Sequence, residues 1–93
     1  MNKIYTLIEK IPKGKVSTYK AVSMKTGIHP RAVGIFLHKN PDPERIPCYK
    51  IVRSDGSLGG YSGGIEKKKK LLEKDGVMIK NGKIDLKKYG HFF

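Results

Sequence analysis

Residues 17–39 read STYKAVSMKTGIHPRAVGIFLHK. Ser17 or Thr18 can cap a helix, because a hydroxyl oxygen at that position accepts a hydrogen bond from a free amide of the first turn. Gly27 breaks this helix, and Pro30 suits the first turn of a second one. Two short helices around a glycine-containing turn, in a basic chain, are typical of a helix-turn-helix.

Each predicted helix has an apolar side that we expect to face the core. The inward residues are Tyr19, Val22 and Met24 in the first helix, and Ala32, Val33, Phe36 and Leu37 in the second. Arg31 lies in the first turn of the second helix, where its charge opposes the positive helix N-terminus. A cation in that place indicates a role outside the fold, such as reaching into DNA; the alternative is an ordinary exposed arginine.

The segment after the helices, residues 46–52, reads IPCYKIV and contains the only cysteine. Pro47 stiffens its backbone, and Ile51 and Val52 favour a short buried strand. Lys50 lies two residues beyond Cys48, and a nearby cation favours the reactive thiolate form. The alternative is that Cys48 is a small buried hydrophobic residue.

The remaining segments predict further small elements. Apolar spacing predicts an amphipathic helix over residues 3–11, and a glycine-rich loop follows over 58–64. Residues 65–74 predict a helix with Ile65, Leu71 and Leu72 buried and its lysines in solvent. Asn81-Gly82 between runs 77–80 and 83–86 predicts a hairpin with a type I′ turn. The predicted fold is mainly α with small β elements: one helix-turn-helix, winged-helix-like domain over residues 1–93 with a short C-terminal hairpin.

The formal charge of +12 comes from 20 Lys and Arg against 8 Asp and Glu in 93 residues. Such a bias suits a polyanion, so we expect nucleic acid as the partner and no membrane. One cysteine allows no internal disulfide, and no Cys/His cluster indicates zinc. No apolar run approaches the ~20 residues that span a bilayer, and no signal peptide precedes the first helix. We therefore expect a monomeric cytoplasmic protein, associated with the nucleoid if prokaryotic.

Several short segments share one further pattern: IPKGKVSTY (11–19), RAVG (31–34), NP (40–41), IPC (46–48) and SDGSLGGYSGG (54–64). In this order and spacing they resemble the C-terminal, DNA-binding domain of O6-alkylguanine-DNA alkyltransferases, the methylated-DNA–protein-cysteine methyltransferases. The resemblance runs from about Ile4 to Gly76. It implies a minimal catalytic module without cofactor or metal, with a separate N-terminal domain or other repair factors as candidate partners.

The resemblance implies a repair chemistry on double-stranded DNA that contains O6-alkylguanine. The damaged base is flipped out from the minor-groove side, and Arg31 fills the gap in the stack. Cys48 takes the alkyl group irreversibly, while Tyr19 donates a proton to the guanine ring. Flipping is chemically reasonable, because a base inside a duplex hides its reactive atom.

Other positions receive roles from the same resemblance. Ser17, Thr18, Ala32 and Lys50 are expected to bind DNA. Asn40 is expected to link the second helix to the cysteine segment by hydrogen bonds. The base pocket and its loop are expected to include Ile51, whose carbonyl would accept from guanine, and Tyr61, Ser62 and Gly63.

Three positions depart from the family pattern. The family reads Pro-Cys-His-Arg, whereas this chain has Tyr49 and Lys50 after Cys48, and Asp75 replaces a glutamate. Tyr49 and Asp75 occupy the activating positions, but a phenol with a pKa near 10 is a poor base at pH 7. The main hypothesis is therefore a single-turnover methyltransferase, and the alternative is a non-catalytic alkyltransferase-like sensor that recruits repair factors. An ordinary helix-turn-helix transcription factor is a weaker third hypothesis, because it leaves Pro47-Cys48 and the glycine-rich loop unexplained.

Overall fold

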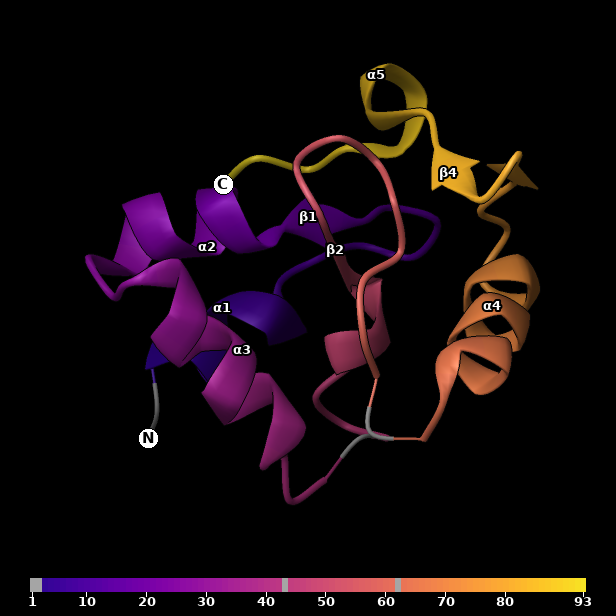
Figure 1. Cartoon of the computed structure of the whole chain (residues 1–93). Helices are drawn as coiled ribbons and strands as arrows, with labels where there is room; N and C mark the ends of the chain where they lie inside the picture. Colours follow the sequence, from indigo (N-terminus) through magenta and orange to yellow (C-terminus); the bar gives the residue numbers. More distant parts are fainter. Residues whose placement is uncertain (1–2, 43, 62) are drawn as a thin grey trace.

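A computed structural model describes residues 3–42, 44–61 and 63–93 (Figure 1). The predicted Ser62 lies outside the described residues. The fold is mainly helical with short strands, as predicted. The elements in chain order are α1 (Lys3–Glu9), β1 (Ser17–Thr18), α2 (Tyr19–Thr26), α3 (Pro30–His38), the 3-10 turn η1 (Cys48–Lys50), β2 (Ile51–Val52), α4 (Ile65–Lys74), β3 (Ile79–Lys80), β4 (Lys83–Ile84) and α5 (Leu86–Tyr89).

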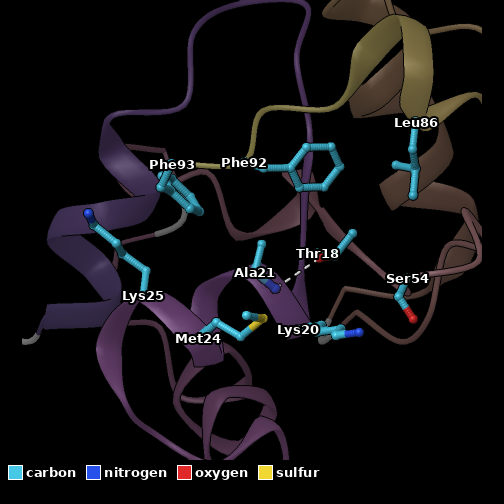
Figure 2. A pocket seen from close by; sticks show the side chains of 9 residues that line it. All are labelled: Thr18, Lys20, Ala21, Met24, Lys25, Ser54, Leu86, Phe92 and Phe93. Carbon is cyan, nitrogen blue, oxygen red and sulfur yellow. Dashed lines mark hydrogen bonds between the residues drawn. The ribbon is translucent and has the colours of Figure 1, made fainter.

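The helix-turn-helix forms as the sequence predicts. Thr18 caps α2, and its hydroxyl oxygen accepts from the Ala21 amide at 3.0 Å (Figure 2). Gly27 ends α2 in the left-handed region, with φ of 75°. Pro30 begins α3, and the ring of His29 caps that helix by accepting from the amide of its second residue. Local capping chemistry therefore sets both ends of the turn.

A parallel pairing of β1 with β2 was not predicted. Ser17 pairs with Ile51 and Thr18 with Val52. Each strand has two residues, which is too short for a period to be recognised in the sequence. The pairing brings the start of α2 beside the end of the turn that begins with Cys48.

Two hydrophobic clusters lie on either side of this small sheet. The first contains Ile51 and the buried faces of α1, α2 and α3, and the second contains Val52, Leu72 of α4 and Ile84 of β4. Ile51 and Val52 serve different clusters because successive strand residues point to opposite faces. Figure 1 accordingly shows β1 and β2 between the N-terminal helices and α4.

The β3–β4 hairpin forms with the predicted turn, since both Asn81 (φ 54°) and Gly82 (φ 73°) have positive φ. Its second strand ends at Ile84 and not at Leu86. Asp85 caps α5 instead, accepting from the Lys87 amide at 3.0 Å. The predicted strand was therefore too long, because an aspartate before a helical turn satisfies the free amide.

Four predictions of burial were wrong. Phe36, expected to face the core, is 37% exposed. Met24 is 76% exposed, since it lies two residues from the buried Val22 and hence on the other side of α2. Ile65 is 47% exposed, because it is the first residue of α4 and belongs to neither hydrophobic cluster. Lys68, expected in solvent, is 1% exposed.

Among the described residues, no helix is long and apolar enough to cross a bilayer.

Candidate active site

A cavity of about 200 Å³ contains the cysteine. Its lining residues come from α2, α3, η1 and the glycine-rich loop, and they are Tyr19, Gly34, Leu37, His38, Cys48, Gly60 and Tyr61. Cys48 is a free cysteine and only 6% exposed. The structure thus brings together Tyr19, Cys48 and Tyr61, three residues that the sequence assigned to one site. Gly63, also assigned to the pocket, is exposed and does not line this cavity.

Backbone hydrogen bonds hold Cys48 in place. Its amide donates to the Ile46 carbonyl at 2.8 Å, and its carbonyl accepts from the Ile51 amide. The segment forms the 3-10 turn η1, which leads directly into β2, the short buried strand predicted from Ile51 and Val52. Asn40 Nδ2 donates to the Ile46 carbonyl at 2.7 Å, so the end of α3 is joined to the cysteine segment as expected.

Two tyrosines, Tyr19 and Tyr61, line the cavity of the thiol and keep their protons. Burial raises the pKa of Tyr19, Arg53 lowers it, and the charge of Cys48 raises it further. Burial and then the charge of Cys48 also raise the pKa of Tyr5 and of Tyr61. Tyr5, which sequence reasoning missed, donates to the Phe36 carbonyl at 2.7 Å. A phenol with a raised pKa is a proton donor at neutral pH, which suits the role expected of Tyr19.

The loop packs against Tyr19 through a glycine. Gly59 has φ of +72°, and a Cβ built there would lie 3.3 Å from the Tyr19 hydroxyl oxygen. Only glycine adopts this backbone region without strain while leaving the hydroxyl undisturbed. The residue therefore fixes both the course of the loop and the position of the phenol.

Lys68 joins the loop to the cysteine segment. Its Nζ donates to the carbonyls of Ile51 at 2.7 Å, Leu58 at 2.5 Å and Gly60 at 3.2 Å. Burial lowers the pKa of Lys68 to about 8, while the charge of Cys48 raises it and Arg53 lowers it. The Ile51 carbonyl, expected to accept from guanine, thus already accepts from Lys68.

Lys50 and Asp75 form a buried ion pair away from this cavity. Lys50 Nζ lies 3.1 Å from Asp75 Oδ2, with side chains 6% and 11% exposed. Lys50 also donates to the Pro12 carbonyl, and the Gly14 amide donates to Asp75. These contacts place Lys50 in the interior, which corrects the expectation that it faces DNA. Asp75 is held by Lys50 and the Gly14 amide.

Tyr49 does not line the cysteine cavity. It lines a different hollow of about 480 Å³, together with Tyr61 and Asp75. Burial raises the pKa of Tyr49, and Asp75 and then Tyr61 raise it further. Tyr49 is therefore a neutral phenol at pH 7, and neither Tyr49 nor Asp75 lines the cysteine cavity.

The residues expected to meet DNA divide into two groups. Arg31 is exposed at the start of α3, and Ala32 beside it is half-buried. Ser17 and Thr18 are 0% and 3% exposed, because they form β1. Their side chains are interior, and Thr18 acts as the α2 cap, so neither is placed to contact a duplex directly.

A hollow of about 420 Å³ lies between α2 and the C-terminal tail (Figure 2). Met24 and Phe92 contribute exposed apolar surface to it, and Lys20 and Lys25 are also among its lining residues. Cys48 does not line this hollow, which is therefore separate from the cysteine cavity. Among the described residues, no group of three His, Cys, Asp or Glu side chains could hold a metal ion.

Comparison with known proteins agrees with the geometry. A family model described as "6-O-methylguanine DNA methyltransferase, DNA binding domain" matches residues 1–77. A bifunctional methyltransferase/endonuclease of Picrophilus torridus is 50% identical over 88 residues, which are 92% of this chain and 30% of that protein. The chain spans 30% to 50% of the length of the first curated relatives it matches.

Two solved structures share the fold. The O6-methylguanine-DNA methyltransferase of Pyrococcus kodakaraensis is 42% identical with a TM-score of 0.76, covering 81% of this chain and 44% of that one. S. pombe Atl1, solved with damaged DNA containing O6-carboxymethylguanine, is 30% identical with a TM-score of 0.82, covering 96% of this chain and 91% of that one. The chain belongs to the 6-O-methylguanine DNA methyltransferase family, whose DNA-binding domain it contains.

Proposed function

We propose that this protein repairs O6-alkylguanine in double-stranded DNA by transferring the alkyl group irreversibly to Cys48. The observation that carries the proposal is the shared cavity of Cys48, Tyr19 and Tyr61, with the recognition helix α3 forming one wall. A buried thiol beside two protonated phenols suits attack on an alkyl carbon within a base-sized pocket. The names of the relatives support the same reaction.

The chemistry needs no redox partner. Cys48 Sγ forms a bond to the alkyl carbon as the bond from that carbon to guanine O6 breaks. Tyr19 donates its proton to the guanine ring, so that the base leaves in its neutral form, and the Tyr19 phenolate then regains a proton from solvent. Lys68 holds the loop of Leu58 and Gly60 against β2, which keeps the cavity walls together during the transfer.

DNA binding follows from charge and from α3. The charge of +12 supplies the phosphate-binding field, and exposed Arg31 at the start of α3 is the wedge that replaces the flipped base. Unstacking one base costs a few kcal/mol, which such a wedge offsets. The protein acts as a monomer on the duplex.

A lesion sensor without transfer is the second candidate function. It is favoured by the position of Tyr49 outside the cysteine cavity, and by the similarity to S. pombe Atl1 over nearly the whole of both chains. Such a protein would bind the damaged base in the same cavity and leave Cys48 unmodified.

Intact-mass measurement separates the two candidates. The protein is incubated with a duplex containing O6-methylguanine and, as control, with the matched guanine duplex. A gain of one methylene with the damaged duplex alone, abolished in Cys48→Ala, supports the transferase. Tight binding to the damaged duplex without mass gain rejects transfer and supports the sensor.

A further inference from the structure

A nucleophilic thiol needs a group that takes its proton, and most side chains around Cys48 cannot do so at neutral pH. The phenols of Tyr5, Tyr19 and Tyr61 have raised pKa values and stay protonated. The ammonium of Lys68 has its donors engaged with three carbonyls. These groups come from α1, α2, the glycine-rich loop and α4, and none of them is a neutral base at pH 7.

Asp75, the carboxylate expected to help activate Cys48, already has two partners. Asp75 accepts from the Gly14 amide and pairs with Lys50 at 3.1 Å. It lines the hollow of Tyr49 and not the cavity of Cys48. The site therefore lacks a carboxylate base among the residues that line the cysteine cavity.

His38 is the imidazole that lines this cavity. It is the last residue of α3, one turn after Gly34, which lines the same wall. The side chain is exposed, so a proton received from inside the cavity can pass on to solvent. Imidazole is the side-chain group that ordinarily gains and loses a proton between pH 5 and 8.

We propose that His38 is the general base that accepts the Cys48 thiol proton within the shared cavity. The S–H bond of Cys48 breaks, its electron pair stays on sulfur, and the proton passes to an imidazole nitrogen of His38. The thiolate then attacks the alkyl carbon, and His38 releases the proton to solvent. The inference rests on the proposed function, since a base for Cys48 matters only if Cys48 acts as a nucleophile.

The test measures thiol reactivity in the free protein, without DNA. The rate of Cys48 alkylation by iodoacetamide is followed by intact mass from pH 5.5 to 9 for the wild type, His38→Gln and His91→Gln. His91 is the matched control, because it packs against Phe93 in the tail and does not line the cavity. General bases typically contribute ~10²–10⁴-fold, so we expect His38→Gln to slow alkylation at pH 7 at least about tenfold.

A second variant keeps the test decisive. His38→Ala leaves room at the cavity mouth, and added imidazole should restore part of its rate while leaving His91→Gln unchanged. Superimposable pH profiles for the wild type and His38→Gln, in proteins with the same unfolding midpoint, would overturn the assignment.

The same proteins are then mixed with the O6-methylguanine duplex, which separates this inference from the proposed function. Slow iodoacetamide reaction in His38→Gln, together with no methyl gain in the wild type, would reject the transferase and leave His38 as the base of a reactive thiol. Methyl gain at equal rates in the wild type and His38→Gln would support the transferase and reject His38.

Discussion

Replacing Lys68 by methionine removes a buried ammonium and keeps a side chain of similar length. The carbonyls of Ile51, Leu58 and Gly60 lose their donor, and the first two of these hydrogen bonds are buried. A buried carbonyl left without a donor costs about 1–3 kcal/mol, so two of them cost about 2–6 kcal/mol.

An opposing contribution comes from the charge itself. Burial lowers the pKa of Lys68 from 10.5 to about 8. At 1.36 kcal/mol per unit, holding the proton at pH 7 costs roughly 3 kcal/mol, and methionine removes this cost. The two contributions largely offset, so Lys68→Met should fold, with an unfolding free energy between about 1 kcal/mol higher and about 3 kcal/mol lower than that of the wild type. The loop of residues 58–60 should nevertheless detach from β2, because these bonds join the two segments.

Urea unfolding at pH 7 measures the stability, and amide hydrogen exchange over residues 56–64 measures the loop. Lys70→Met is the matched control, because Lys70 is exposed on the same helix. The pH dependence gives a second readout. Between pH 8 and 10.5 the unfolded chain holds the Lys68 proton and the folded chain does not, so the wild type gains stability as pH rises relative to Lys68→Met.

Two results would refute this reasoning. A loss well above 5 kcal/mol would mean that the ammonium contributes far more than its two buried bonds. Unchanged exchange over residues 56–64 would mean that side-chain packing, and not Lys68, holds the loop.

Further outcomes follow from single contacts. Asp75→Ala should cost about 3–5 kcal/mol in urea unfolding, because it leaves the Lys50 charge buried and unpaired; a loss below about 1 kcal/mol would contradict the ion pair. Gly59→Ala should cost about 1–2 kcal/mol and displace the Tyr19 ring, visible as a changed tyrosine NMR shift. Arg31→Ala should slow methyl transfer more than it weakens duplex affinity, and equal losses would count against the wedge. Duplex affinity should fall linearly in logarithmic salt concentration, and a flat response would exclude the basic surface as the DNA site.

The sequence predicted the elements whose ends carry local chemistry. Thr18, Gly27 and Pro30 define the helix-turn-helix through caps and backbone preferences that act within a few residues. Asn81-Gly82 defines the hairpin in the same way. The β1–β2 pairing was missed because its register is set by tertiary packing, and two-residue strands carry no periodic signal.

The sequence predicted the aromatic residues and the cysteine of the site, but it did not predict that Lys50 and Lys68 are buried. A run of four lysines is typical of a solvated helix face. Lys68 nevertheless points inward, because its ammonium donates hydrogen bonds to three carbonyls from distant segments. Lys50 is buried for a similar reason, through Asp75 and the Pro12 carbonyl. A spacing signal existed for Lys68, since it lies four residues before the buried Leu72 on one helix face. His38 had no local signal, because its place depends on how α3 meets the cysteine turn.

The connection of Val16 to the tail has a consequence for the order of folding. The Val16 amide donates to the Tyr89 carbonyl at 2.8 Å, and the His91 amide donates to the Val16 carbonyl at 2.7 Å. Val16 immediately precedes β1, so the segment that positions Tyr19 is completed by residues near the end of the chain. Contacts so distant in sequence form late in folding, so the segment before α2 gains these two backbone bonds only after the local helix-turn-helix has formed. Loss of the Val16 contacts would therefore loosen the segment that carries Tyr19, although the residues concerned lie far from the thiol in sequence.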